Sequence, residues 1–193
     1  MNGKVMVFTD TLNLIQHPLL KNFTKHALSR APDYFFSIPA SSSGKYHPDY
    51  SLGTGGLLRH TKALCYIAKD LHDSNMFELT ELEYAEALVA LHLHDILKKG
   101  DPEKPHTIFK HPILASRFVD MVNDDLPLEE SLSDTVMNDI CEAIESHMGR
   151  WNKDTKDDTY TLPTPKTRLQ RFVHTCDYIG SRRYLEVNFN KLK

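Results

Sequence analysis

The chain has 193 residues, of which 40% are hydrophobic and 25% charged, so it can bury one core without needing a second domain. Its net charge of −3 excludes the broad basic surface of proteins that hold long nucleic acids mainly through phosphates, whereas small anionic or short-stranded substrates stay open. Three distant cysteines without a C-x-x-C motif (Cys65, Cys141, Cys176) exclude a disulfide framework and indicate a reducing compartment.

The first ten residues, MNGKVMVFTD, include polar and acidic side chains, and no segment approaches eighteen unbroken apolar residues. This pattern argues against secretion and against a membrane span. We expect a cytoplasmic protein, in a cell or in the host of a virus.

In the N-terminal third, VMVF at residues 5–8 is compatible with a short strand, and residues 11–31 have helical apolar spacing interrupted by Pro18. That spacing predicts two short helices, or one helix with the proline in its first turn. Residues 31–56 are rich in proline, glycine and serine and predict a loop. Residues 57–73 predict an amphipathic helix whose buried face includes His60.

Residues 80–83, T-E-L-E, predict a capping box that begins a helix running to Gly100. A connector follows, and then helices over residues 111–124 and 131–151, the second with His147 at the end of its apolar stripe. Residues 152–166 form a candidate flap, and 166–187 contain the last helix. The sequence therefore predicts an all-α fold of five or more helices.

Five of these elements each bring metal-competent side chains to the edge of a buried face. They are His60, His94 with Asp95, His111, His147 and Asp177. Each histidine alone is more often a hydrogen-bonded core residue than a ligand.

The adjacent pair His94 and Asp95 is the sharpest signal, because a buried carboxylate without a cation or donors is strongly penalised. A metal ion would neutralise the carboxylate, and an ion pair with Lys98 three residues later is the alternative. His92 lies about 200° around a helix from His94 and is not expected to share its ion.

The order of these residues resembles that of the HD-domain metal-dependent phosphohydrolase superfamily. It is most similar to members with a two-metal site, including the HD-domain 3′-to-5′ exonucleases and the HD-GYP phosphodiesterases. The resemblance covers about residues 40–185 of one domain spanning 1–193, and it is carried by the segments GGLLRHT, LHLHDILK, HPILASR, IESHMG and HTCDYI.

The resemblance implies that one divalent metal is held by His60, His94, Asp95 and Asp177, and that Asp95 bridges to a second metal held by His111 and His147. Imidazole and oxygen ligands suit Mn, Fe, Co, Ni, Zn or Mg. A water shared by the two ions would be the nucleophile.

Asp95 and Lys98 are the expected catalytic residues. Lys98 would stabilise charge on the phosphoryl oxygens, with a solvated lysine at a helix end as the alternative. Two positions depart from the family pattern: Leu97 replaces a glycine, and Met148 replaces the second histidine of a pair.

The expected substrate-binding residues come from three places. The loop before the first ligand offers His47 and Lys45, the segment after His147 offers Arg150 beside Trp151, and the end of the last helix offers Arg182. Trp151 is suited to stacking on a base or to packing. Arg59, next to His60, is expected to point to phosphate or to solvent.

These features predict a phosphodiesterase that acts on a nucleotide or short nucleic acid, at an oligonucleotide 3′ end or on a cyclic nucleotide. A nucleotidase or dNTP phosphohydrolase is the second possibility within enzymes. A regulatory HD module that binds a metal or nucleotide without catalysis is the rival class, and the oligomeric state stays open.

Overall fold

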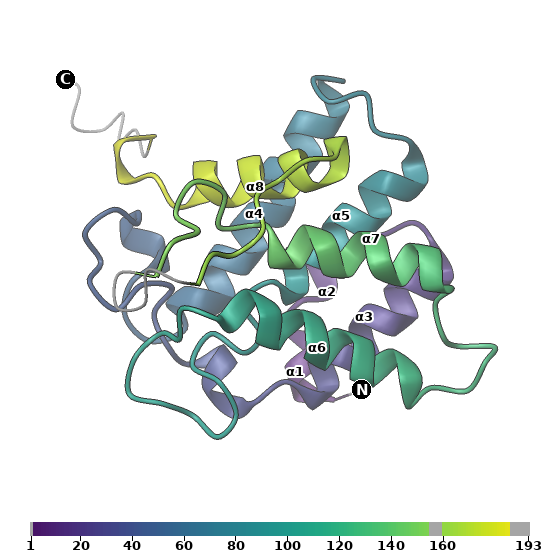
Figure 1. The fold of residues 1–193 in the computed structure, drawn as a ribbon, viewed down its shortest axis with the longest axis horizontal. Coiled ribbons are helices and arrows are strands. Elements are labelled where there is room, and N and C mark those ends of the chain that lie inside the picture. The colour runs from purple at the N-terminus through teal and green to yellow at the C-terminus, as the bar shows by residue number, and fades with distance from the viewer. Residues whose placement is uncertain (1, 155–159, 186–193) are drawn as a thin grey trace.

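A computed structural model describes residues 2–154 and 160–185, and this part of the chain is all-α (Figure 1). It contains eight α-helices and three short 3-10 turns, with one isolated bridge between Lys153 and Thr161 and no β-strand. The α-helices are α1 Gly3–Met6, α2 Thr9–Leu12, α3 Pro18–Arg30, α4 Gly56–Asp73, α5 Glu81–Leu93, α6 His111–Asp124, α7 Asp134–Glu145 and α8 Arg168–Gly180. The 3-10 turns are η1 Asp33–Phe36, η2 Asp49–Ser51 and η3 Arg183–Leu185. The all-α prediction is confirmed.

Helix α5 is the centre of the fold. It begins at Thr80 with the predicted capping box, in which Thr80 and Glu83 satisfy each other's backbone N–H groups. Every residue from Tyr84 to Leu93 is buried, as expected for a helix that is apolar on all sides. Helices α3, α4, α7 and α8 pack around it.

The outer helices form two close pairs, α4 with α8 and α6 with α7, and the second pair lies side by side in Figure 1. Prolines begin two of the helices, because Pro18 and Pro112 occupy first-turn positions where a missing N–H costs nothing. No described helix is both long enough and apolar enough to cross a membrane.

Three predicted elements were wrong in type or extent. Residues 5–8 are not a strand: Asn2 caps the short helix α1, and Val5 and Phe8 bury their side chains in the core. Helix α5 ends at Leu93 rather than at Gly100, because residues 94–100 continue as tight turns with i to i+3 hydrogen bonds. Helix α7 likewise ends before His147.

The segment before α4 is irregular, as predicted, but it is anchored rather than free. Backbone hydrogen bonds join residues 37–40 to residues 51–57. Gly56 permits this close approach, because a Cβ there would lie 2.2 Å from the Ser51 carbonyl oxygen. The guanidinium of Arg59 donates to the carbonyls of Tyr50, Leu52 and Thr54. Arg59 is therefore exposed to solvent, as one of its two predicted orientations had it, and it also ties down this loop.

Candidate metal centre

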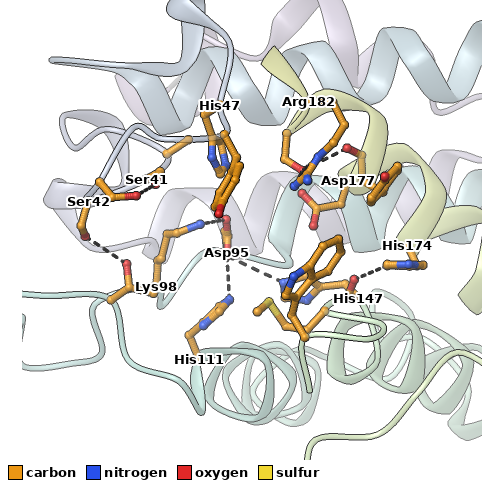
Figure 2. A pocket seen from close by; sticks show the side chains of 18 residues that line it. Ser41, Ser42, His47, Asp95, Lys98, His111, His147, His174, Asp177 and Arg182 are labelled. Carbon is orange, nitrogen blue, oxygen red and sulfur yellow. Dashed lines mark hydrogen bonds and ion pairs between the residues drawn. The ribbon is translucent and has the colours of Figure 1, made fainter. Parts of the chain in front are cut away.

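The six predicted ligands converge in one buried region from five parts of the fold. His60 and Asp177 project from the interiors of α4 and α8, and His111 is the first residue of α6. His94 and Asp95 follow α5, and His147 follows α7. Five of the six are buried, with Asp177 partly exposed. Figure 2 shows Asp95 between Lys98, His111 and His147.

One half of the cluster joins α4, α5 and α8. His60 Nε2 lies 3.1 Å from Asp177 Oδ1, and His94 Nε2 lies 3.9 Å from the same oxygen. One ligand atom from each of these three residues lies within 4.8 Å of the others. This spacing fits three donors around one cation.

The other half gathers around Asp95. His94 Nε2 lies 3.3 Å from Asp95 Oδ2, whereas His111 Nε2 and His147 Nε2 lie 3.0 Å and 4.0 Å from Oδ1. His94, Asp95 and His147 form a second group whose ligand atoms lie within 4.8 Å of one another. The two groups share His94, whereas the resemblance implies that Asp95 is the residue shared between the two metals.

Backbone carbonyls orient three of the four imidazoles. The Nδ1 atoms of His94, His111 and His147 lie 2.9, 2.7 and 2.7 Å from the carbonyl oxygens of Leu91, Ile108 and Ile144. A carbonyl can only accept, so each Nδ1 carries a proton, and in its neutral form each ring presents an Nε2 lone pair toward the cluster. Metal-bound histidines commonly donate their other ring N–H to an acceptor in this way.

Buried polar atoms at the centre have no hydrogen-bond partner among the described residues. They include Asp95 Oδ1 and the Nε2 atoms of His94 and His111. When the His111 ring is neutral with its proton on Nδ1, its Nε2 lone pair repels Asp95 Oδ1 3.0 Å away, and leaving such buried atoms unpaired is costly. A divalent cation between them would remove both penalties, so the residues present fit a metal ion.

The charges of the cluster favour ionised carboxylates. Burial alone would raise the pKa of Asp95, but the positive charge of Lys98 and the neighbouring His94 hold that pKa well below its ordinary value. Burial likewise opposes ionisation of Asp177, and the hydrogen bond from His60 keeps its pKa low. Burial lowers the pKa of His147 to about 3, which keeps this ring neutral.

A cavity of about 420 Å³ opens beside the cluster and is lined by Asp95, His111, His147 and Asp177. One side carries the hydroxyls of Ser41, Ser42 and Thr107, and the other side carries aromatic and cationic side chains that include Arg182. Figure 2 shows Ser41 and Ser42 on one side of Asp95 and Arg182 on the other.

The predicted substrate-binding residues divide into two groups. His47 and Arg182 line the cavity, and the His47 ring lies 5.6 Å from that of His60. Burial, followed by the charges of His60 and Lys98, lowers the pKa of His47 to about 4. Lys45 and Arg150 instead line smaller neighbouring hollows of about 350 and 230 Å³.

Lys98 both forms the ion pair predicted as an alternative to a metal ion and lies where it can meet a substrate. Its Nζ lies 2.5 Å from Asp95 Oδ2, which is the predicted i to i+3 ion pair, and its side chain also lines the cavity. His92 stays apart from the cluster as expected, because it is fully buried between Thr11 and the Leu88 carbonyl.

Sequence reasoning missed several residues that line the cavity. They are Ser41, Ser42, Ser43, Thr107, His174, Tyr178 and Ser181. His174 and Ser181 had a usable signal, because they lie three residues before and four residues after Asp177 and so share its helix face. His174 also holds a ligand in place. Its Nδ1 donates to the His147 carbonyl at 2.7 Å and holds the turn that carries this ligand. Met148, the departure from the family pair, also lines the cavity.

The comparisons with known proteins agree with this geometry. A family model described as the HD domain matches residues 49–181, which span His60, the His94 and Asp95 pair, and Asp177. No curated protein and no solved structure matched the chain.

Proposed function

The chain belongs to the HD-domain family, a superfamily of metal-dependent phosphohydrolases, and from this premise we propose that it is a phosphodiesterase acting on a nucleotide-like substrate. The observation that carries the proposal is the set of buried imidazole and carboxylate atoms around Asp95 that have no hydrogen-bond partner among the described residues. Such a set is costly in a structural core and useful around a cation.

We assign the metal ligands as the resemblance predicts. His60, His94, Asp95 and Asp177 would hold one divalent ion, and Asp95, His111 and His147 a second, as in the two-metal members of the superfamily. The high imidazole content favours a transition metal over magnesium. Bound there, the metals would activate a water molecule and polarise the phosphoryl group.

The chain's own residues have distinct parts in this proposal. Asp95 orients the cluster, with one carboxylate oxygen toward His111 and the other toward Lys98. Lys98 is half-buried at the cavity wall, so its ammonium can neutralise a phosphoryl oxygen where water screens weakly. His47 also lines the cavity, is mainly neutral near pH 7, and can hydrogen-bond the same group.

The shape of the cavity favours a diester over a monoester. Its volume of about 420 Å³ lies in the range that takes small ligands. The hydroxyl side and the aromatic side flank the ligand cluster, so a central phosphorus atom with a substituent on each side would contact both. A monoester carries a substituent on only one side of its phosphorus atom, so it would contact only one of these sides.

The regulatory alternative rests on one position. Met148 offers a thioether where the family pair has an imidazole, and its half-buried side chain reaches the cavity. If this loss abolishes catalysis, the chain would bind a metal or nucleotide without turning it over.

The test is a hydrolysis panel on purified protein with Mn²⁺, using bis(p-nitrophenyl) phosphate, p-nitrophenyl phosphate, cyclic dinucleotides, a labelled oligonucleotide and dNTPs. We expect the diesters to be cleaved at least tenfold faster than the monoester, and cleavage to be lost in Asp95→Asn. Asp134→Asn, at the exposed start of α7, is the matched control and should stay active. Tight metal binding with no hydrolysis of any substrate would instead favour the regulatory module.

A further inference from the structure

Three aromatic rings gather around the Arg182 guanidinium, which lies on the other side of Asp95 from Ser41 and Ser42 (Figure 2). We call this group, Tyr46, Trp151, Tyr178 and Arg182, the aromatic wall. The rings of Trp151 and Tyr178 are stacked, with centroids 5.7 Å apart and planes inclined by 20°. The Arg182 guanidinium lies 4.7 Å from the Tyr178 ring, 5.1 Å from Trp151 and 5.8 Å from Tyr46.

The aromatic wall is assembled from three separate segments. Tyr46 belongs to the loop before α4, Trp151 to the segment after α7, and Tyr178 and Arg182 to α8 and its end. Arg182 is held in place by Ser181, whose hydroxyl accepts from its Nε at 3.3 Å and from its terminal nitrogen at 2.9 Å. A planar cation is therefore fixed against aromatic faces beside the candidate metal centre.

Core packing does not account for these rings. Tyr46 is 56% exposed and Trp151 is 39% exposed, although both line the cavity. A second cation, Arg150, lies 4.5 Å from the Trp151 ring. Large exposed aromatic rings with guanidinium groups beside them are the surfaces on which unpaired bases stack.

We propose that the aromatic wall is a nucleobase subsite that makes the enzyme select phosphodiesters carrying a base on this side of the phosphorus. Trp151, which is 39% exposed, offers ring surface for stacking, and Arg182 offers either stacking or a hydrogen bond to a base edge. Stacking is tolerant of base identity, so the subsite distinguishes base-bearing from base-free diesters rather than one base from another. The inference rests on the proposed function for the position of the phosphate, but base binding can be measured without turnover.

Binding is tested through Trp151, which is the one tryptophan in the sequence. We expect thymidine 5′-monophosphate to quench its fluorescence saturably, and deoxyribose 5-phosphate, which lacks a base, to leave it unchanged. Arg182→Gln should weaken the thymidine 5′-monophosphate affinity about tenfold, since one stacked base contributes on the order of 5- to 100-fold in affinity. Tyr66→Ala removes an exposed tyrosine from another face of α4 and should leave this affinity unchanged.

Selectivity is tested with two diesters that share a leaving group, the p-nitrophenyl ester of thymidine 5′-phosphate and methyl p-nitrophenyl phosphate. Trp151→Ala should raise KM for the thymidine ester about tenfold, with kcat within about twofold and the methyl ester unaffected. Trp151→Phe should retain most of the selectivity. Equal losses on both esters would show a structural role and overturn the subsite.

The two proposals fail in different ways. If the proposed hydrolysis is wrong, neither ester is cleaved while thymidine 5′-monophosphate still quenches Trp151. If the nucleobase subsite is wrong, both esters are cleaved with similar KM values, and the nucleotide and the base-free sugar phosphate give the same fluorescence.

Discussion

The substitution Lys98→Met separates the two tasks assigned to this lysine. In the metal-free protein, Lys98 is the closest cation to the Asp95 carboxylate, at 2.5 Å, and the two side chains are 12% and 2% exposed. Removing one partner of a buried ion pair costs about 3–5 kcal/mol. We expect a loss near the lower limit, about 3 kcal/mol, because Lys98 keeps some contact with solvent at 12% exposure.

Metal binding should change this cost. A divalent cation bound by Asp95 supplies the charge that Lys98 supplies in its absence, so the loss in the Mn²⁺-saturated protein should fall below about 1 kcal/mol. The measurement is urea unfolding of both proteins, once with a chelator and once with saturating Mn²⁺. Lys69→Met is the matched control: it breaks an exposed ion pair with Asp73 and should change stability by less than about 0.5 kcal/mol in both conditions. An equal loss for Lys98→Met with and without Mn²⁺ would refute the reasoning.

Two further predictions concern the stability effects of residues that are not themselves ligands. Gly149→Ala should cost about 2–3 kcal/mol and weaken metal binding, because Gly149 has φ +56° and a Cβ would lie 2.2 Å from the His174 ring that holds the His147 turn. Gly53→Ala, at φ +65° with open space around it, should cost only about 1 kcal/mol, and equal urea midpoints for the two variants would contradict the clash. Burial, followed by the charges of Asp139 and Glu83, raises the pKa of Glu86 to about 7 from 4.5. Because the folded state holds this proton more tightly, stability should fall as pH rises from about 4.5 to 7. Glu86→Gln should therefore stabilise by about 1–2 kcal/mol near pH 8 and have no effect below about pH 4; a pH-independent difference in urea midpoint would rule this out.

The helices could be predicted because their signals are local. Periodicity placed His60 on the buried face of α4, and T-E-L-E marked the start of α5. The ends of α5 and α7 could not be predicted in the same way, because the apolar pattern continues through the turns that follow them. In both places the chain leaves the helix one or two residues before a predicted ligand, and tertiary hydrogen bonds such as Tyr34 Oη to the Gly100 carbonyl hold the turn after α5.

The convergence of the six predicted ligands could be predicted from their order and residue types. The residues that line the cavity wall could not be predicted in this way. The serine hydroxyls of the loop before α4 and the rings of Tyr46 and Tyr178 carry no spacing signal, since they come from loops and helix ends that only the tertiary fold brings together. Trp151 and Arg182 were noticed separately, and their mutual contact depends on the packing of α7 against α8. The predicted flap at 152–166 lies partly outside the described residues.

The central claim is that the cluster around Asp95 binds metal, and elemental analysis of the purified, untreated protein tests it most directly. We predict about one to two divalent transition-metal ions per chain. Asp95→Ala should abolish stoichiometric metal, whereas the exposed control Asp134→Asn should retain it. A wild-type chain that holds no metal even after dialysis against Mn²⁺, Fe²⁺, Co²⁺, Ni²⁺ and Zn²⁺, or an Asp95→Ala chain that holds as much as the wild type, would contradict the account.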